Sequence, residues 1–488
     1  MKRNIILLLT AICIAFCGCE DFLDKAPISN ASVQNFYNTE ADFQNAIYGA
    51  YRALRNVGTY NDYVQLIGDL ASDNTEMGST ASDRSVLNEM SLFRIQSHST
   101  VVRDVWNHHY QAIWYTNVLL DRVDGANISV QTKTRVGAEA KFLRGLFYFN
   151  LVRIFGDVPL VTKDLTSVEE AYSKGRSPVA EVYAHIIQDL REAAQSLPLT
   201  VPNEQGRATS GAAWALLGKV YLTQGNIADA KTALKTVIDS RVYELLPDYN
   251  DLWEVTNKHH NEAIFEVQYQ ASVSGGTGSS YTERYTPYMY TGLPYSSTAG
   301  GYNIPTEDLV NAYEPGDLRK DASLHTSWVN TSGEVVTGLP GRFTNKFRHM
   351  PIRGGGSSDN WPILRYADVL LLYAEALNAE AFVANGEAFN YLNMIRNRAG
   401  LPSKMADHSD PSLRLDSQND FALAIEQERR VELAFEGHRW YDLVRTGRAI
   451  EVLSPKMPNG VQQHQLVFPL PLTQIDLNPT KLKQNPGY

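Results

Sequence analysis

The chain has 488 residues, enough for one large domain or two to three ordinary ones, and 43% of its residues are hydrophobic. Its formal net charge of −10 argues against a nucleic-acid partner and against a polybasic membrane contact. All three cysteines lie in the first twenty residues, which excludes a disulfide framework or a cysteine-based metal site in the folded body. The chain is rich in Tyr, a residue common on surfaces that bind sugars or peptides because its ring is apolar and its tip is polar.

The N-terminus has the pattern of a bacterial lipoprotein signal. Two basic residues precede an apolar run over 5–16 that is too short to be a comfortable membrane span. The run ends in Phe-Cys-Gly-Cys, which resembles a lipobox and predicts a signal peptide over 1–18 with Cys19 as the lipidated first residue. The alternative is a plain secretory signal cleaved nearby. Acidic residues follow at once and suit a solvated tether, so we assign 19–38 to a lipid tether and N-terminal segment.

Helical spacing dominates the next part of the chain. Thr39 is a predicted N-cap, and apolar residues follow it at helical spacing. Residues 61–85 show no period and predict a loop. Helices are expected over 101–123 and 133–155, and the second is apolar almost all round, which is typical of a buried helix. Ser177-Pro178 is expected to open a further helix, with Ser as its cap.

Residues 210–237 have the large/small pattern of a tetratricopeptide unit. Trp214, Leu217, Gly218 and Tyr221 share one helical face, and a second stripe follows a short polar break. A small residue in the first helix lets the second approach closely. The alternative is an ordinary helical hairpin. One such unit cannot bury its own apolar face, so we expect others, including a degenerate hairpin over 370–395.

The composition changes after a predicted strand over 263–269. From residue 271 to 360, Gly, Ser, Thr and Tyr dominate and helical stripes vanish. A stretch of this length without helix is usually functional or a small subdomain. Helices resume near residue 364, and one over 421–435 is capped by Ser417.

Motifs of enzyme chemistry are missing from the sequence. It has no HExxH, no P-loop and no GxSxG, and its adjacent His pairs diverge on a helix, so we predict no enzyme, no cofactor and no metal site. A calcium ion held by scattered loop oxygens stays an open alternative. Glu428 with Glu432 or Glu436 could form the acid/base pair of a hydrolase. These residues share one helix, however, whereas glycosidase carboxylates flank the bond that they cleave.

Several segments together resemble the SusD/RagB family of Bacteroidetes surface lipoproteins. They occur in the family's order and are Ala138–Phe149, Gly156–Leu160, Arg365–Ala376, Glu428–Leu443 and Gln484–Tyr488. The resemblance implies a mainly α fold, in which tetratricopeptide-like hairpins form a scaffold and an irregular, loop-rich subdomain binds the ligand. It also implies a surface-exposed, lipid-anchored location in the outer membrane. The expected partner is a SusC-like TonB-dependent transporter, to which the protein delivers glycans; the alternative is a RagB-like lid of a peptide importer.

The charges inside these motifs favour a structural role. Glu428, Glu432 and Glu436 alternate with three arginines, Arg429, Arg430 and Arg439, at spacings that predict intrahelical ion pairs. Arg365 and Asp368 are expected to behave in the same way.

The predicted ligand site combines flat aromatic rings with polar side chains, because sugar rings present apolar C–H faces ringed by hydroxyls. The aromatic candidates are Tyr281, Tyr285, Tyr288, Tyr290, Tyr295 and Trp328. The polar candidates come from the early loop and are Asp73, Asn74 and Arg84. For any single Tyr, loop packing or a transporter contact is the alternative. We assign Trp106, Trp114, Trp214 and Trp440 to the core. A basic patch at Arg342, Lys346 and Arg348 would reverse the mild preference of an acidic protein against polyanionic glycans.

The resulting division of the chain has five parts. After the signal peptide and the tether come a helical region over 39–270, a loop-rich binding subdomain over 271–361 and a C-terminal helical region over 362–488.

Overall fold

The structure is a computed structural model that describes residues 36–78, 85–273, 277–287, 290 and 300–488. The predicted signal peptide and Cys19 lie outside these described residues, as do Arg84, Tyr288 and Tyr295. The described part is mainly α-helical, as predicted. None of its helices is both long enough and apolar enough to cross a bilayer.

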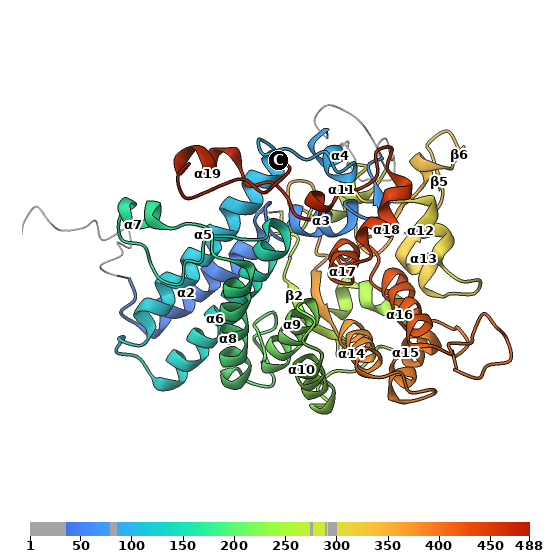
Figure 1. Cartoon of the computed structure of the whole chain (residues 1–488), viewed down its shortest axis with the longest axis horizontal. Helices are drawn as coiled ribbons and strands as arrows, with labels where there is room; N and C mark the ends of the chain where they lie inside the picture. The colour runs from blue at the N-terminus through green and yellow to red at the C-terminus, as the bar shows by residue number, and fades with distance from the viewer. Residues whose placement is uncertain (1–35, 79–84, 274–276, 288–289, 291–299) are drawn as a thin grey trace, which may run out of the picture.

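Helices of the first half stand side by side in a row (Figure 1). They are α2 (Glu40–Arg52), α5 (Thr100–Val123), α6 (Val130–Phe155), α8 (Val179–Ser196), α9 (Ser210–Thr223) and α10 (Ile227–Asp239). From α5 onward each packs against the next, and α2 packs against both α5 and α6. The row continues in the second half through α14 (Tyr366–Glu380), α15 (Glu387–Arg398) and α16 (Gln418–Glu432). One cluster of buried hydrophobic side chains runs along the row, from Phe43 to Leu470.

Two glycines explain how closely these helices pack. A Cβ atom added at Gly218 in α9 would lie 2.5 Å from Cγ of Leu234 in α10. One added at Gly145 in α6 would lie 2.9 Å from Cδ2 of Leu190 in α8. Protein interiors have no slack to absorb such overlaps, so both positions favour glycine. The prediction that a small residue at Gly218 lets the next helix approach is confirmed, and α14 packs against α15 as the predicted second hairpin.

Helix starts follow the predicted caps with small differences. The Thr39 side chain accepts from the backbone N–H of Asp42, whose carboxylate in turn accepts from the backbone N–H of Thr39. Ser417 caps α16. The helix expected to open at Ser177 begins at Val179 instead, with Pro178 as its N-cap.

The loop predicted over 61–85 is wrong in part. It contains α3 (Tyr63–Leu70) and β1 (Thr75–Glu76). Every residue of α3 after Tyr63 is buried. The helix is only eight residues long, which is shorter than the window over which a helical period can be recognised, and its start has no side-chain capping hydrogen bond. These two features explain why the sequence pattern missed it.

The remaining helices are short and lie between or after the long ones. The α-helices are α4 (Ser85–Ser91), α7 (Val168–Ser173), α17 (Arg439–Arg445), α18 (Ala449–Leu453) and α19 (Leu472–Leu477). The 3₁₀ turns are η2 (Ala53–Arg55), η4 (Tyr249–Trp253), η5 (Val255–Asn257), η6 (Leu339–Gly341), η7 (Ser454–Lys456) and η8 (Gln463–Leu466). Helix α19 lies beside α5 and α7 near the upper left of Figure 1.

The irregular part of the chain is the stretch between strands β2 (Ala263–Val267) and β8 (Trp361–Arg365), which pair with each other. Strand β2, which was predicted, pairs antiparallel with β8, so Val267 faces Trp361 and Ala263 faces Arg365. Between them lie short elements only. These are α11 (Tyr281–Tyr285), β3 (Ile304–Pro305), α12 (Glu307–Ala312), α13 (Arg319–Ser323), β4 (Leu324–His325), β5 (Trp328–Val329), β6 (Val335–Val336) and β7 (Phe343–Thr344).

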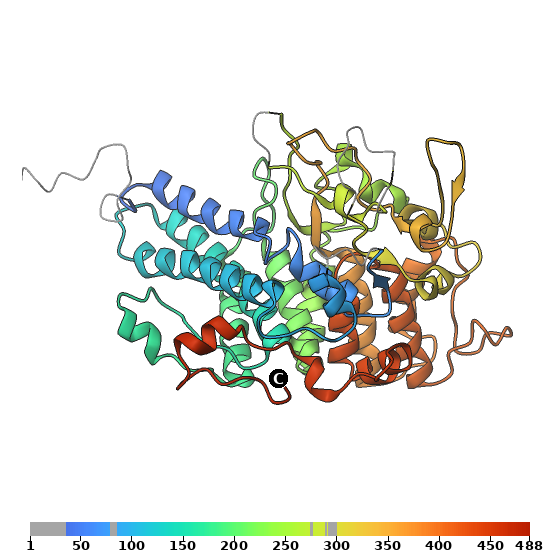
Figure 2. The same cartoon turned by 90° about the horizontal axis from the view of Figure 1, so that it is seen from above.

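The short strands form antiparallel pairs. Strand β4 pairs with β7, β5 with β6, and β1 with β3. The β1–β3 pair ties the early segment after α3 to the irregular part. The β5–β6 hairpin projects from the edge of the molecule, which both views show (Figures 1 and 2).

Buried charges join the irregular part to the C-terminal helices. We call the following set the charged junction: Arg319, Lys346, Arg365, Glu428, Glu432 and Glu436. Arg365 donates to Glu436 (Nε–Oε2 2.7 Å), Lys346 donates to the same carboxylate (Nζ–Oε1 2.7 Å), and Arg319 donates to Glu428 (Nη1–Oε1 2.6 Å). The prediction of intrahelical ion pairs is therefore wrong, although the structural role of these charges is confirmed.

The other motif charges also pair between elements. Arg429 of α16 donates to Asp368 of α14 (Nη1–Oδ1 2.7 Å) and to Asp442 of α17 (Nε–Oδ2 2.9 Å). Both acids lie on other helices, at sequence separations of 61 and 13 residues. Arg429 is buried, and both of its carboxylate partners come from neighbouring helices.

Candidate ligand-binding site

Two of the predicted aromatic residues belong to the core. The side chains of Tyr281 and Tyr285 are 0% and 1% exposed. Tyr281 packs against Trp361 with ring centroids 5.1 Å apart, and its hydroxyl donates to the Tyr60 carbonyl oxygen. Burial raises the pKa of both tyrosines above the usual range. A ring without a free face cannot stack on a sugar, so we withdraw Tyr281 and Tyr285 from the candidate site.

Two of the predicted polar residues are buried as well. Asp73 and Asn74 are 3% and 1% exposed. Asp73 accepts from Arg439 (Oδ1–Nε 2.7 Å), and Asn74 accepts from Arg430 (Oδ1–Nε 2.9 Å). Burial alone would raise the pKa of Asp73, but the hydrogen bond and charge of Arg439, with the charge of Arg430, lower it to about 2. Asp73 and Asn74 therefore anchor the early segment to the C-terminal region and leave the candidate site.

The predicted Tyr290 and Trp328 come together with their rings partly exposed. Their centroids are 5.1 Å apart and their planes are 73° apart, an edge-to-face pair. Phe343 of β7 lies 5.5 Å from Tyr290 and 4.7 Å from His325. We call these four residues, Tyr290, His325, Trp328 and Phe343, the aromatic cluster. Trp328 Nε1 donates to the Pro340 carbonyl (2.8 Å), which holds the indole in place on the β5–β6 hairpin.

The surface around the aromatic cluster is apolar. On the hairpin, Val329 and Val335 are 63% and 64% exposed. They are paired across the β5–β6 ladder, so the hairpin keeps two apolar side chains in solvent. Burial lowers the pKa of His325, which keeps this ring neutral at physiological pH and suited to packing against Phe343. The cluster therefore offers flat, uncharged surface at a projecting edge.

The predicted basic patch does not form. Arg342 pairs with Glu76 (Nη2–Oε1 3.0 Å), and Arg348 pairs with Glu254 (Nη2–Oε1 2.5 Å). Lys346 lies inside the charged junction, where burial lowers its pKa to about 8 against the charge of Glu436. Each cation already has a carboxylate, so these three residues make no positive surface for a polyanion.

The irregular part also contains a hydrogen-bonded His that the sequence analysis missed. The Nδ1 atom of His349 is 2.6 Å from Asp359 Oδ1, and its Nε2 atom is 3.3 Å from Glu254 Oε2. The hydrogen bond to Asp359 raises the pKa of His349, against the effect of partial burial. These acids are ten and 95 residues away in the chain, so no local motif marks the arrangement.

The carboxylates considered for hydrolysis are held by arginines. Glu428 is 2% exposed and accepts from Arg319 and from Arg396 (Oε2–Nη1 3.1 Å). A general acid must hold a proton and reach its substrate, and this carboxylate is neither free nor open to solvent. Among the described residues, no group of three or more His, Cys, Asp or Glu side chains could hold a metal ion.

The tryptophans that were assigned to the core divide into three groups. Trp106 and Trp440 are buried, as predicted, and Trp214 is partly buried. Trp114 is 48% exposed, which corrects its assignment to the core. It lies on α5, and its Nε1 donates to Asp164 (3.1 Å). A single apolar residue on the outer face of a long helix is an ordinary surface feature.

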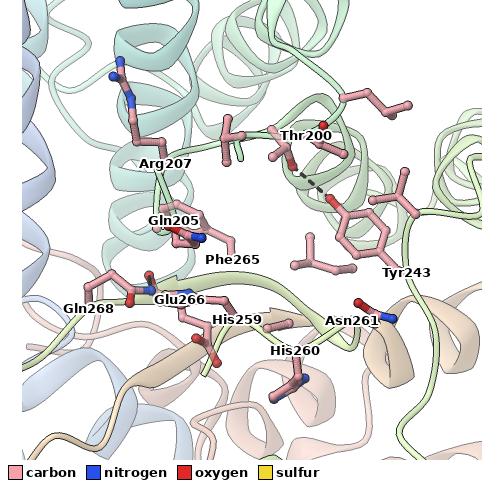
Figure 3. Close-up of a pocket in the computed structure, with 17 residues that line it drawn as sticks. Thr200, Gln205, Arg207, Tyr243, His259, His260, Asn261, Phe265, Glu266 and Gln268 are labelled. Atoms are coloured by element: carbon pink, nitrogen blue, oxygen red, sulfur yellow. Dashed lines mark hydrogen bonds between the residues drawn. The ribbon is translucent and has the colours of Figure 1, made fainter. Parts of the chain in front are cut away.

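A pocket of about 180 Å³ has no residue in common with the aromatic cluster. It lies between the segment before α9 and strand β2 (Figure 3). Figure 3 shows Gln205 and Gln268 at one end and Tyr243 at the other, with the Tyr243 hydroxyl 2.9 Å from Thr209 Oγ1. The sequence analysis missed this pocket because its walls come from three separate segments.

Comparison with known proteins places both ends of the chain in one family. Residues 337–488 match a family described as the SusD family, and residues 21–222 match one described as "Starch-binding associating with outer membrane". SusD-like protein P2 of Formosa agariphila is 29% identical over 99% of this chain and 98% of its own length.

Solved structures agree with that assignment. A laminarin binding SusD-like protein is 31% identical, with a TM-score of 0.79 over 93% of this chain and 100% of the other. Surface glycan-binding protein A from Bacteroides fluxus is 25% identical, with a TM-score of 0.79 over 92% of this chain and 100% of the other. The sequence motifs, the helical row and these full-length similarities lead to one conclusion: the chain belongs to the SusD/RagB family.

Proposed function

We propose that this protein is a cell-surface lipoprotein that binds glycans and delivers them to a SusC-like TonB-dependent transporter. The observation that carries the proposal is the partly exposed edge-to-face pair of Tyr290 and Trp328 at the projecting β5–β6 hairpin. Relatives of similar length that are named for laminarin or glycan binding support the ligand class. Anchoring through Cys19 rests on the lipobox-like sequence, and the transporter partner rests on family membership.

The aromatic cluster suits the C–H face of a sugar ring. A pair of rings at an angle forms a corner in which one sugar face packs on the indole while the phenol hydroxyl reaches a sugar hydroxyl. Tyr288 and Tyr295 belong to the same Tyr-rich stretch as Tyr290, and they stay in the proposed site. The division of the chain that sets 271–361 apart as the binding subdomain is part of this proposal. The pairing of β2 with β8, which joins the two ends of that stretch, supports it.

The charges favour a neutral glycan at the aromatic cluster. The ion pairs of Arg342 and Arg348 with glutamates leave neither guanidinium group uncompensated beside the hairpin. A polyanionic ligand would have to break these pairs or lie against the carboxylates of a protein whose net charge is −10. We therefore choose laminarin and starch oligosaccharides as the first probes.

Isothermal calorimetry on the chain from residue 20 onward tests the proposal. We expect saturable binding of one neutral glycan class, with affinity lost at least tenfold in Tyr290→Ala and in Trp328→Ala, because each removes a stacking face. Trp114→Ala is the matched control, since it removes an equally large exposed ring from α5, far from the hairpin in sequence.

The outcomes separate the proposal from its alternatives. Equal binding by the Trp328→Ala variant and the original protein would exclude the aromatic cluster as the site. Binding of mixed oligopeptides with no binding of any glycan would replace glycan delivery with peptide import. Release of reducing sugar that stops in Glu428→Gln would make the protein a hydrolase.

A further inference from the structure

A second pocket adjoins the one in Figure 3 and opens beside helix α2. We call it the α2 pocket; its volume is about 260 Å³. Tyr48 and Arg52 of α2, Arg55 of η2 and the exposed Gln205 line it. Gly206 and Gln268 line both pockets, and Gly206 leaves no room for a Cβ, which would lie 2.4 Å from Gln268 Cγ.

The α2 pocket has an aromatic wall that is fixed from behind. Tyr48 is 48% exposed, and the Arg207 guanidinium lies 5.5 Å from its ring centroid. Arg207 is itself buried and held by Glu139 through two hydrogen bonds from Nε of 3.0 and 3.1 Å. The ring therefore rests on a rigid support, and its remaining surface borders the pocket.

Two arginines in the same pocket have no ion pair with another described residue. Arg52 and Arg55 follow Tyr48 by four and seven positions, which places all three on one side of the helix. This differs from Arg207, whose charge is balanced by Glu139 and Glu204.

The pocket also contains one carboxylate, Glu266, which is not paired with either arginine. Glu266 accepts a hydrogen bond from the Asn360 amide (Oε2–Nδ2 3.0 Å) and forms no ion pair with another described residue. Two guanidinium groups against one carboxylate leave the pocket with an excess of one positive charge, which is a local preference for an anion in a chain with a net charge of −10.

We propose that the α2 pocket is a second glycan subsite that binds a uronic acid unit. It rests on the proposed function only in that the ligand is a glycan, and no residue of the α2 pocket belongs to the aromatic cluster. The C–H face of the sugar packs on Tyr48, Arg52 and Arg55 bind its carboxylate, and the Gln205 amide binds its hydroxyls.

Each element of this assignment has a reason. A lone exposed arginine is ordinarily just solvated. Here two arginines lie beside a supported aromatic ring and the amide of Gln205. These side chains match the three kinds of group on a sugar acid, which are its carboxylate, its C–H face and its hydroxyls. Pockets for drug-sized ligands start at about 300 Å³, so the α2 pocket has room for one or two sugar units rather than a long oligosaccharide.

Calorimetry with a matched pair of ligands tests the carboxylate. The ligands are trigalacturonic acid and its methyl ester, which share a backbone and differ in charge, and the protein is the chain from residue 20 onward. We expect saturable binding of the acid and at least tenfold weaker binding of the ester, because the ester cannot form charge-assisted hydrogen bonds with the arginines. Absence of binding by the acid, or equal affinity for both ligands, would overturn the proposal.

Variants assign the binding to the α2 pocket. The double variant Arg52→Gln/Arg55→Gln and the single variant Tyr48→Ala are each expected to lose at least tenfold in affinity for the acid. Both should keep laminarin binding and thermal stability unchanged. Arg94→Gln is the control, since Arg94 is also exposed and has no ion pair with another described residue.

Three results would contradict this assignment. Full retention of acid binding in both pocket variants would place the site elsewhere. Competition by sodium sulfate at the same concentration as the sugar acid would reduce the pocket to a general anion site. Loss of laminarin binding in the double variant would mean that the α2 pocket and the aromatic cluster are not separate sites. By contrast, a failure of the Tyr290 and Trp328 variants to affect laminarin binding bears only on the aromatic cluster.

Discussion

The charged junction and the aromatic cluster use their side chains for opposite purposes. In the charged junction every charge is buried and has an opposite charge within 3.2 Å, so each member already has an ion-pair partner inside the protein. In the aromatic cluster the rings of Tyr290 and Trp328 touch each other and keep part of their surface in solvent. The segments that carry the family resemblance supply Arg365 and the three glutamates of the first region, whereas Arg319, Lys346 and the whole second region lie outside these segments. The motifs of this chain therefore identify the fold, while the residues of the proposed ligand site lie outside them.

The largest effect is expected from breaking the charged junction. Glu432 accepts from Arg365, Arg398 and Arg319, and Glu432→Ala would leave three buried guanidinium groups short of a carboxylate. Removing one partner of a buried ion pair typically costs about 3–5 kcal/mol of folding free energy. We expect a large drop in the denaturation midpoint, measured by circular dichroism. The control is Arg414→Ala, whose exposed pair with Asp416 should contribute about 0–1 kcal/mol.

The same experiment tests whether the charged junction joins the irregular part to α16. Burial would raise the pKa of Glu432, but the charges of Arg398, Arg365 and Arg319 outweigh it and lower the pKa below the usual range. A carboxylate stabilised in this way contributes stability above its unfolded pKa and loses it in acid. If Glu432→Ala unfolds at the same denaturant concentration as Arg414→Ala, the junction is not what joins the irregular part to α16.

A second, smaller effect is expected where two helices meet. Gly218→Ala would place a Cβ atom 2.5 Å from Leu234 Cγ, and overpacking of this kind costs about 1–3 kcal/mol. Gly49→Ala is the matched control, because Gly49 is also inside a helix but has no atom within 4 Å of its added Cβ. There the gain in helix propensity should stabilise the protein by about 0.5–1 kcal/mol. Equal midpoints for the two variants would mean that α9 and α10 can move apart freely.

Sequence periodicity was sufficient for the helical row. The stripes of α2, α5 and α10 each have one exposed face, and the caps at Thr39 and Ser417 mark where two helices begin. It failed at α3, which is only eight residues long and starts without a side-chain cap. The partners of Arg365 and Glu432 could not be predicted either, because they depend on which segments the fold brings together.

For the candidate site, composition could not separate core residues from surface residues within the Tyr-rich stretch. Tyr281 and Tyr290 lie in one Tyr-rich run, yet the first is fully buried and the second is partly exposed. A tyrosine serves equally well in a core and on a binding surface, and only the surroundings decide between them. Asp73 was chosen as a polar contact because it lies in an apparent loop, whereas its carboxylate is bound by Arg439.

The smallest effect is expected from the pH dependence of His349, which belongs to neither region. Its acidic neighbours are Asp359 and Glu254, and Arg348 binds the same Glu254 from the other side. The raised pKa means that protonated His349 stabilises the fold. This contribution is complete below the unfolded pKa of about 6.5 and is lost as pH rises through the folded value.

His349→Gln should therefore lower the melting temperature most at pH 5.5 and progressively less toward pH 8.5. Taking the difference between variant and original at each pH cancels the titration of all other groups that the substitution does not touch. His98→Gln, which changes an exposed His after α4, should give a flat difference. A difference for His349→Gln that grows toward alkaline pH would mean that the neutral ring is the stabilising form, and that Asp359 is held by Ser357 and Thr282 rather than by the imidazole.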